Sequence, residues 1–285
     1  KHTTMTKKYI LTILATAFCL ISTAQDDLKL KLDSIATSGL EKGIPGIQVI
    51  ISDSKGYTIY NYGHHEIEKT TEVNDSTRWR YGSITKVFTA VMILQLESEG
   101  KLSIDDSVTK YIDLKQHNAA GITIKHLLNH SSGLYNYTAS KKLKWEDTPN
   151  QCLENSLKRK LNFTPGSKYD YCNTGYVILG LIIEKITAQS YQQNITERIF
   201  KPCGLESMIY CSDDKIPFNT ARGYKIKHNK YTDFTEIDHS WANSAGAVLG
   251  NLTDLNKFVD CLFKGNLIDS SQLKKMISPT IIYRD

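Results

Sequence analysis

Residues 79–96 read WRYGSITKVFTAVMILQL, and this stretch decides the fold. From Ile84 onward its apolar residues recur at helical spacing, which predicts a long buried helix over Ser83–Glu99. Ser83 and Lys86 stand three residues apart, so they share one face at the start of that helix. The chain holds six Ser-x-x-Lys tetrads, and only this one opens a long apolar helix. Because an amine beside a hydroxyl helps a serine to lose its proton, Ser83 is a candidate nucleophile.

A second interpretation gives the same residues a purely structural role. Ser83 is a suitable N-cap, and Lys86 can be a solvated residue of the first helical turn. Two features count against this alternative. A lysine has the unfavourable charge for a helix N-terminus, and the aromatic, glycine-containing approach to Ser83 can form a tight turn.

The second motif is Tyr171-Cys172-Asn173, the only Tyr-x-Asn in the chain. It follows a Thr-Pro-Gly turn signal at 164–166 and precedes a strongly apolar helix pattern. A tyrosine at such a junction can point into a cleft and transfer protons. The alternative is a packed tyrosine followed by an asparagine that caps the next helix. This motif alone supports both interpretations equally.

The two motifs together resemble those of the serine β-lactamase and penicillin-binding-protein superfamily, in the branch of class C β-lactamases, D-alanyl-D-alanine carboxypeptidases and related esterases. Three further stretches resemble the family in the same order: GIPGI at 43–47, LLNHSSGL at 127–134, and Ser-Ala-Gly at 244–246 followed by Thr-Asp-Leu at 253–255. The resemblance covers the chain from about Leu28 to about Pro279.

The resemblance implies an α/β (α+β) fold of the β-lactamase/transpeptidase type. An antiparallel sheet of about five strands is flanked by helices, a mainly helical subdomain stands beside it, and the active site lies in the cleft between them. The residue patterns add a helix over Asp27–Lys42, a hairpin of strands Ile47–Ser52 and Tyr57–Tyr62, and further helices. Those helices are expected at Ile124–His130, Pro149–Leu161, Thr174–Thr187, Tyr191–Phe200 and Asp254–Lys264, the last with Thr253 as its cap.

The resemblance also implies acyl transfer through a covalent intermediate. Ser83 is the expected nucleophile, Lys86 helps to take its proton, Tyr171 is the partner acid/base, and Asn173 orients Lys86 and binds the substrate amide. The backbone N–H of Ser83 is expected to supply one oxyanion donor. The expected substrates are D-Ala-D-Ala peptides, β-lactams or small esters, with peptidoglycan as a further partner and no cofactor.

The family's third motif, Lys-Thr-Gly or His-x-Gly, does not occur in the sequence. We therefore expect residues 25–285 to form a β-lactamase-like domain that lacks its C-terminal strands. Loss of one oxyanion donor costs roughly 3–4 kcal/mol of transition-state stabilisation, so the chain as written is expected to be poorly active. The rival hypothesis is a non-catalytic binder of peptidoglycan or β-lactams, or a degenerate enzyme.

The N-terminal residues 1–24 have the pattern of a secretory signal peptide. A short basic region around Lys7 and Lys8 precedes an apolar stretch from Tyr9 to Ile21, and small residues then stand before Gln25. The apolar stretch is too short to span a bilayer, so no stable membrane anchor is expected. The predicted location of the mature chain is the periplasm.

Composition favours a globular enzyme, since 285 residues with 40% hydrophobic content can bury a large core. The formal net charge is +5, but Lys1, Lys7 and Lys8 belong to the predicted signal peptide. Without them, 32 basic residues face 30 acidic ones. This near balance argues against a nucleic-acid partner, and we expect a monomer.

Cysteines and histidines complete the sequence evidence. Five of the six cysteines remain after Cys19 is removed, and Cys203 and Cys211 are close enough for a bridge, although nothing in the sequence establishes one. His126 and His130 have the i, i+4 spacing of zinc ligands but lack the Glu of His-Glu-x-x-His. We therefore expect no metal.

Overall fold

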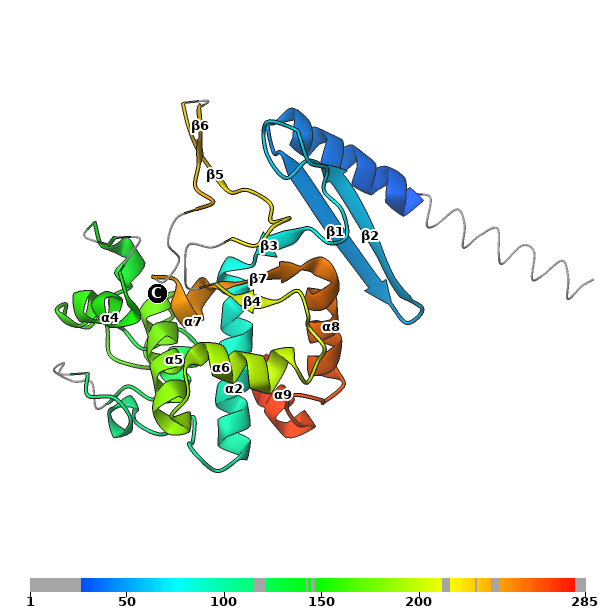
Figure 1. The fold of residues 1–285 in the computed structure, drawn as a ribbon. Coiled ribbons are helices and arrows are strands. Elements are labelled where there is room, and N and C mark those ends of the chain that lie inside the picture. Colours follow the sequence, from blue (N-terminus) through cyan, green and yellow to red (C-terminus); the bar gives the residue numbers. More distant parts are fainter. Residues whose placement is uncertain are drawn as a thin grey trace, which may run out of the picture. The chain divides into compact units, whose positions relative to one another are not determined.

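The computed structural model describes residues 27–114, 121–141, 143–144, 147–211, 216–228, 230–236 and 241–279. The predicted signal peptide, residues 1–24, lies outside these ranges. The described chain combines helices with small antiparallel sheets (Figure 1). The predicted α/β (α+β) class is therefore confirmed.

The elements have the following bounds. Strands lie at Gly46–Asp53 (β1), Gly56–Gly63 (β2), Arg78–Arg80 (β3), Ile209–Tyr210 (β4), Tyr224–Lys227 (β5), Lys230–Asp233 (β6) and Val248–Asn251 (β7). Helices lie at residues 27–41, Thr85–Ser98 (α2), Ile124–Leu128 (α3), Pro149–Leu157 (α4), Asn173–Thr187 (α5), Tyr191–Ile195 (α6), Asn243–Gly246 (α7), Leu252–Phe263 (α8) and Ser270–Ile277 (α9). Short 3-10 turns lie at Gly82–Ile84, Val108–Lys110 and Tyr137–Ala139, and a π-helical turn lies at Thr196–Phe200.

The chain divides into two compact units. Among the described residues, the first contains those from Asp27 to Val49 together with Tyr60–Val73, and the second contains Ile50–Ile59 and those from Asn74 to Pro279. In the first unit the Tyr62 hydroxyl donates a hydrogen bond to Asp33 Oδ1 at 2.9 Å, which ties the N-terminal helix to a strand. The predicted N-terminal helix and hairpin strands are confirmed, with ends that differ by one residue.

The core of the second unit is built around α2 and α5. Both helices are apolar on nearly all sides, which is typical of helices buried in a domain centre. Phe88 of α2 is fully buried and stacks on Phe258 of α8, with ring centroids 4.0 Å apart. Helix α5 contacts α2, α3, α4, α6 and α7. These two helices also carry Lys86 and Asn173, so the core fixes the candidate site.

Helix α2 starts later than the sequence predicts. Ser83 lies in the 3-10 turn before it, and the N-cap of α2 is Ile84, which makes no side-chain capping bond. Gly82 opens the turn with φ +52, a left-handed conformation that glycine adopts at little cost. The capping interpretation of Ser83 is therefore wrong, and its hydroxyl is available for other contacts.

A three-stranded sheet, ordered β3-β7-β4, holds this turn in place. Strand β3 runs antiparallel to β7, with Trp79 opposite Gly250. Two residues further on, the backbone N–H of Tyr81 donates to the Val248 carbonyl at 3.0 Å. The N–H of Val248 in turn donates to Thr85 Oγ1 at 3.1 Å. The end of the sheet thus fixes both sides of Ser83.

Several predicted details are corrected by the structure. Helix α8 is capped by Asn251, whose side chain accepts from the N–H of Asp254, rather than by Thr253. Cys203 forms its disulfide with Cys261, while Cys211 is buried and is not disulfide-bonded. The predicted helices near residues 124–130 and 149–161 end two and four residues earlier, and the one over 191–200 changes to a π-helical turn. Within the described ranges, no helix has the length and apolar character needed to cross a membrane.

Candidate active site

Ser83 is exposed on its turn and lies at the centre of a hydrogen-bonded group. Its Oγ accepts a hydrogen bond from the Tyr171 hydroxyl at 2.7 Å and another from Lys86 Nζ at 3.2 Å. Tyr171 is 88 residues away in the sequence. The fold therefore brings together the three residues that the sequence singled out as candidate catalytic groups.

Lys86 is the buried member of this group, with 6% of its surface exposed. Besides Ser83, its Nζ donates to Asn173 Oδ1 at 2.8 Å and to the Ala245 carbonyl at 2.7 Å. Nζ also lies 5.0 Å from the ring centroid of Tyr171. Burial disfavours the charged form and lowers the pKa of the Lys86 amine to about 8. A neutral amine that can accept a proton is thus accessible close to neutral pH.

The loop before α5 is fixed by side chains that the sequence patterns did not single out. Asn136 Oδ1 accepts from the N–H of Asn173 at 3.3 Å, and Asn136 Nδ2 donates to the Tyr171 carbonyl at 3.4 Å. Thr138 Oγ1 accepts from Asn173 Nδ2 at 3.1 Å. Asn173 is the first residue of α5, and the N-cap is Cys172, which makes no capping bond with its side chain. Asn173 is therefore held with its Oδ1 in contact with Lys86 Nζ, and it does not cap the helix.

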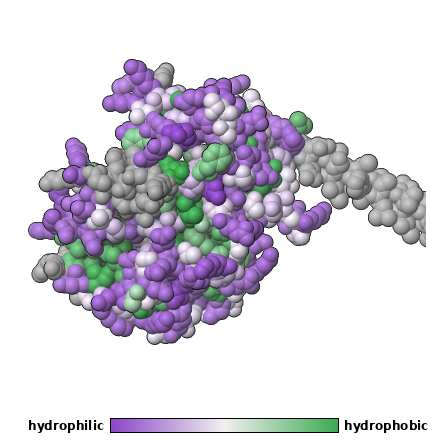
Figure 2. Space-filling view, viewed as in Figure 1, coloured by the Kyte–Doolittle hydropathy of each residue, from purple (hydrophilic) through white to green (hydrophobic). Residues whose placement is uncertain are grey.

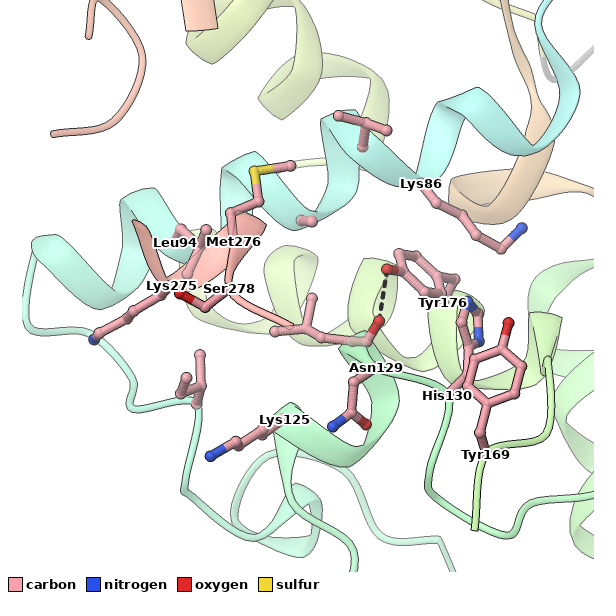
Figure 3. A pocket seen from close by; sticks show the side chains of 14 residues that line it. Lys86, Leu94, Lys125, Asn129, His130, Tyr169, Tyr176, Lys275, Met276 and Ser278 are labelled. Atoms are coloured by element: carbon pink, nitrogen blue, oxygen red, sulfur yellow. Dashed lines mark hydrogen bonds between the residues drawn. The ribbon is translucent and has the colours of Figure 1, made fainter. Parts of the chain in front are cut away.

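His130 packs against the ring of Tyr171, and on another side it lies beside Tyr176, as Figure 3 shows. Its ring centroid lies 4.4 Å from that of Tyr171 and 5.3 Å from that of Tyr176. Its Nδ1 accepts a hydrogen bond from the N–H of Cys172 at 3.2 Å. Burial and the nearby Lys86 ammonium lower the pKa of His130 to about 4, so the imidazole is neutral at physiological pH. In the described part of the chain, no group of three or more His, Cys, Asp or Glu side chains could hold a metal ion.

Two cavities adjoin this group. One of about 430 Å³ contains Ser83 and Asn173, and its walls include the aromatic rings of Tyr137 and Trp241. Its other lining residues are Arg80, Gly82, Thr138, Leu143, Ala242, Ala245 and Gly246. A larger cavity of about 600 Å³ includes Lys86, His130 and Tyr176 but not Ser83 (Figure 3). The smaller cavity is therefore the one in which a bound molecule can reach Ser83.

The backbone around Ser83 suits a developing negative charge. The N–H groups of a first helical turn have no partner within their helix, and they lie at the positive end of its dipole. Ser83 occupies such a position directly before α2. Its N–H is the candidate for one oxyanion donor.

An exposed serine that is hydrogen-bonded to both a lysine and a tyrosine, at the start of a buried helix, defines the class of the active-site-serine hydrolases. The chain belongs to the Beta-lactamase family, whose model matches residues 27–281. The predicted resemblance is thereby confirmed.

Individual relatives agree with this membership. The chain is 30% identical over 240 residues to the putative penicillin-binding protein PbpX of Bacillus subtilis, covering 84% of this chain and 60% of that protein. It also resembles the structure of a D-stereospecific amidohydrolase from Streptomyces sp., with 30% identity and a TM-score of 0.76 over 85% of this chain and 74% of the other. The structure of a D-amino acid amidase from Ochrobactrum anthropi SV3 is similar too, with 26% identity and a TM-score of 0.80 over 88% of this chain and 75% of the other. The chain spans about half the length of other curated relatives that it matches.

Proposed function

We propose that this chain is the acylating part of an exported serine hydrolase, and that Ser83 forms its acyl-enzyme. The observation that carries the proposal is the contact of Ser83 Oγ with both Tyr171 and Lys86, at 2.7 and 3.2 Å. Ser83 is exposed beside the cavity, while Lys86 is buried. A substrate carbonyl can therefore reach the nucleophile while its base stays shielded from water.

The proposed acylation moves two protons. Ser83 Oγ attacks the carbonyl carbon and gives its proton to the neutral amine of Lys86. The N–H of Ser83 stabilises the resulting oxyanion. Tyr171 then donates its hydroxyl proton to the leaving amine or alcohol as the acyl bond breaks, and the Lys86 ammonium stabilises the remaining phenolate.

Deacylation reverses these transfers. A water molecule gives one proton to the Tyr171 phenolate, and its oxygen attacks the acyl carbon. As the ester bond breaks, Ser83 Oγ recovers the proton held by Lys86. The product is a carboxylic acid, and all three side chains return to their starting protonation states.

We propose D-Ala-D-Ala peptides, β-lactams or small esters as substrates, and amides of D-amino acids as probes. The names of the relatives support this range, since they include a penicillin-binding protein, a D-stereospecific amidohydrolase and a D-amino acid amidase. The rings of Tyr137 and Trp241 in the cavity wall suit an apolar group next to the reacting carbonyl. No cofactor is required by this scheme.

Export to the periplasm is proposed from the signal-peptide pattern of residues 1–24. The disulfide between Cys203 and Cys261 supports this proposal, because disulfides persist in oxidising compartments. Expression in a Gram-negative host, fractionation and N-terminal sequencing give the test. A mature chain beginning at Gln25 in the periplasm is expected, whereas an uncleaved chain in the cytoplasm would contradict the proposal.

The enzymatic proposal is tested with a fluorescent penicillin and with D- and L-phenylalanine amide. We expect labelling and D-amide hydrolysis by the parent chain, and loss of both in Ser83→Ala. Ser98→Ala is the matched control, because Ser98 is exposed and begins another Ser-x-x-Lys tetrad. If Ser83→Ala labels as strongly as the control, Ser83 is not the nucleophile. Labelling without turnover would favour the second candidate function, a binder that traps its ligand.

A further inference from the structure

The ribbon of β5 and β6 has two chemically different faces. In the register of this antiparallel pair, Lys225 lies opposite Thr232 and Lys227 lies opposite Lys230. Opposed residues of such a pair share one face. Lys225, Lys227 and Lys230 therefore stand together on what we call the cationic face, and all three are exposed. The opposite face carries Tyr224, Ile226 and Tyr231.

The charge of the cationic face is not balanced within the described residues. The two described acidic side chains of the ribbon segment, Asp233 and Glu236, both form ion pairs with Arg222 at its base. Lys225 Nζ lies over the ring of Phe234, 5.6 Å from its centroid, and that contact leaves its charge in place. Among the residues that the structure describes, these three ammonium groups thus have no carboxylate partner, and they stand on one side of a narrow ribbon.

The pair formed by Lys227 and Lys230 is unfavourable for the free ribbon. Like charges directly opposite each other destabilise an antiparallel pair. An anionic group bound between the two ammonium groups would remove this repulsion. The arrangement therefore costs stability in the free protein and favours an anionic partner.

The base of the ribbon is attached to the wall of the Ser83 cavity. Arg80, which lines that cavity, donates from Nη2 to the Thr235 carbonyl at 3.0 Å. Thr235 Oγ1 accepts from the N–H of Gly223 at 2.9 Å, which closes the base of the ribbon. The strands extend away from the rest of the second unit in Figure 1, and their outer end is mainly hydrophilic in Figure 2. A polymer held by the ribbon would thus lie near the entrance to the cavity.

We propose that the cationic face binds a peptide polymer rich in carboxylates and holds it beside the Ser83 cavity. Residues two apart on a strand are about 7 Å apart, so Lys225 and Lys227 match carboxylates on alternate residues of an extended acidic peptide. A bilayer is a poorer partner, because insertion of the ribbon's outer end would dehydrate Lys227, His228 and Lys230. The delivery of this polymer to Ser83 rests on the proposed function, but its binding does not.

The test is fluorescence anisotropy with labelled poly-glutamate at low ionic strength. The triple variant Lys225→Gln, Lys227→Gln, Lys230→Gln is compared with a control triple at Lys158, Lys160 and Lys185, which are exposed and lie outside the ribbon. We expect binding at least about tenfold weaker in the ribbon variant, an unchanged control, and loss of parental binding in high salt. Equal weakening of both triples would show a non-specific effect of net charge and overturn the proposal.

A variant with an added carboxylate tests the role of the cationic face again, and anionic vesicles distinguish a peptide site from a membrane surface. Thr232→Glu places a carboxylate opposite Lys225, so it is expected to weaken poly-glutamate binding without removing a lysine. Anionic vesicles that bind in a ribbon-dependent way, with no binding of poly-glutamate, would overturn the proposal in favour of a membrane surface. Ser83→Ala must bind poly-glutamate as the parent does. A failure of Ser83 acylation with intact poly-glutamate binding would therefore reject the proposed function and leave the ribbon's role standing.

Discussion

Lys86 is the residue on which the proposed chemistry depends most. Its amine is buried, donates to Ser83, Asn173 and Ala245, and has a pKa lowered to about 8 by burial. A lysine with its ordinary pKa would be almost fully charged at neutral pH and could not accept a proton. The lowered value leaves roughly one tenth of the amine neutral at pH 7.

The pH dependence of acylation follows from this pKa. Because the neutral amine is the reactive form, the acylation rate is expected to rise roughly tenfold between pH 7 and pH 9 and then level off. Stopped-flow measurements with a chromogenic β-lactam or an activated ester test this. A rate that stays flat or falls over this interval would mean that Lys86 remains charged during the reaction and that another group takes the proton.

Tyr171 is expected to contribute through its hydroxyl alone. Tyr171→Phe keeps the ring that packs against His130 but removes the bond to Ser83 Oγ. The acylation rate should fall by about 10²- to 10⁴-fold, while the unfolding midpoint changes little. Tyr169→Phe is the control, because Tyr169 also contacts His130 but has no role in the proposed proton transfers. Equal rates in the two variants would remove Tyr171 from the mechanism.

At the scale of elements, the close packing of α5 against α7 positions the acceptor of Lys86. A Cβ added to Gly180 would collide with the side chain of Ser244, which is fully buried. The next residue, Ala245, provides the carbonyl that Lys86 contacts. Gly180 is therefore a point where packing and the site are directly coupled.

Gly180→Ala tests this coupling. Overpacking should destabilise the protein by about 1–3 kcal/mol and slow acylation, because α7 must shift together with the Ala245 carbonyl. Denaturant unfolding and acylation kinetics measure the two effects. Gly223→Ala is the control, since a Cβ there meets open space. An unchanged acylation rate in Gly180→Ala would show that α7 does not position Lys86.

The sequence predicted the type of most elements better than their ends. The hairpin of β1 and β2 and the apolar helices α2 and α5 follow from periodicity, because burial enforces the pattern along the whole element. The ends depend on single local contacts. Helix α8 is capped by Asn251 rather than Thr253, and Ser83 lies in a 3-10 turn rather than at the cap of a helix. The apolar pattern of the sequence is the same in either case, so it could not predict these details.

At the scale of the whole molecule, the three catalytic candidates were predictable because short motifs and family resemblance select them. The contacts that support these candidates could not be predicted, because tertiary packing brings the supporting groups to the site. These groups are Asn136, Thr138, His130 and the Ala245 carbonyl. The disulfide partner of Cys203 could not be predicted from the sequence either, because it too depends on tertiary packing. Cys261 is 58 residues away in the sequence, and only the fold places the two together.

That disulfide is expected to contribute strongly to stability. Closing a loop of this length stabilises a protein by about 4 kcal/mol in the chain-entropy treatment. Cys203→Ala with Cys261→Ala should lower the unfolding free energy by about 2–5 kcal/mol under oxidising conditions. Reductant should destabilise the parent by a similar amount and leave the double variant unchanged. A parent that unfolds identically with and without reductant would contradict this prediction.

The most direct test of the account is mass spectrometry of the protein after brief reaction with a penicillin. We predict one covalent adduct per chain, which peptide mapping locates on Ser83 and which is absent in Ser83→Ala. An adduct on any other residue, or no adduct on the folded chain, would contradict the assignment of Ser83, Lys86 and Tyr171 as the acylating group.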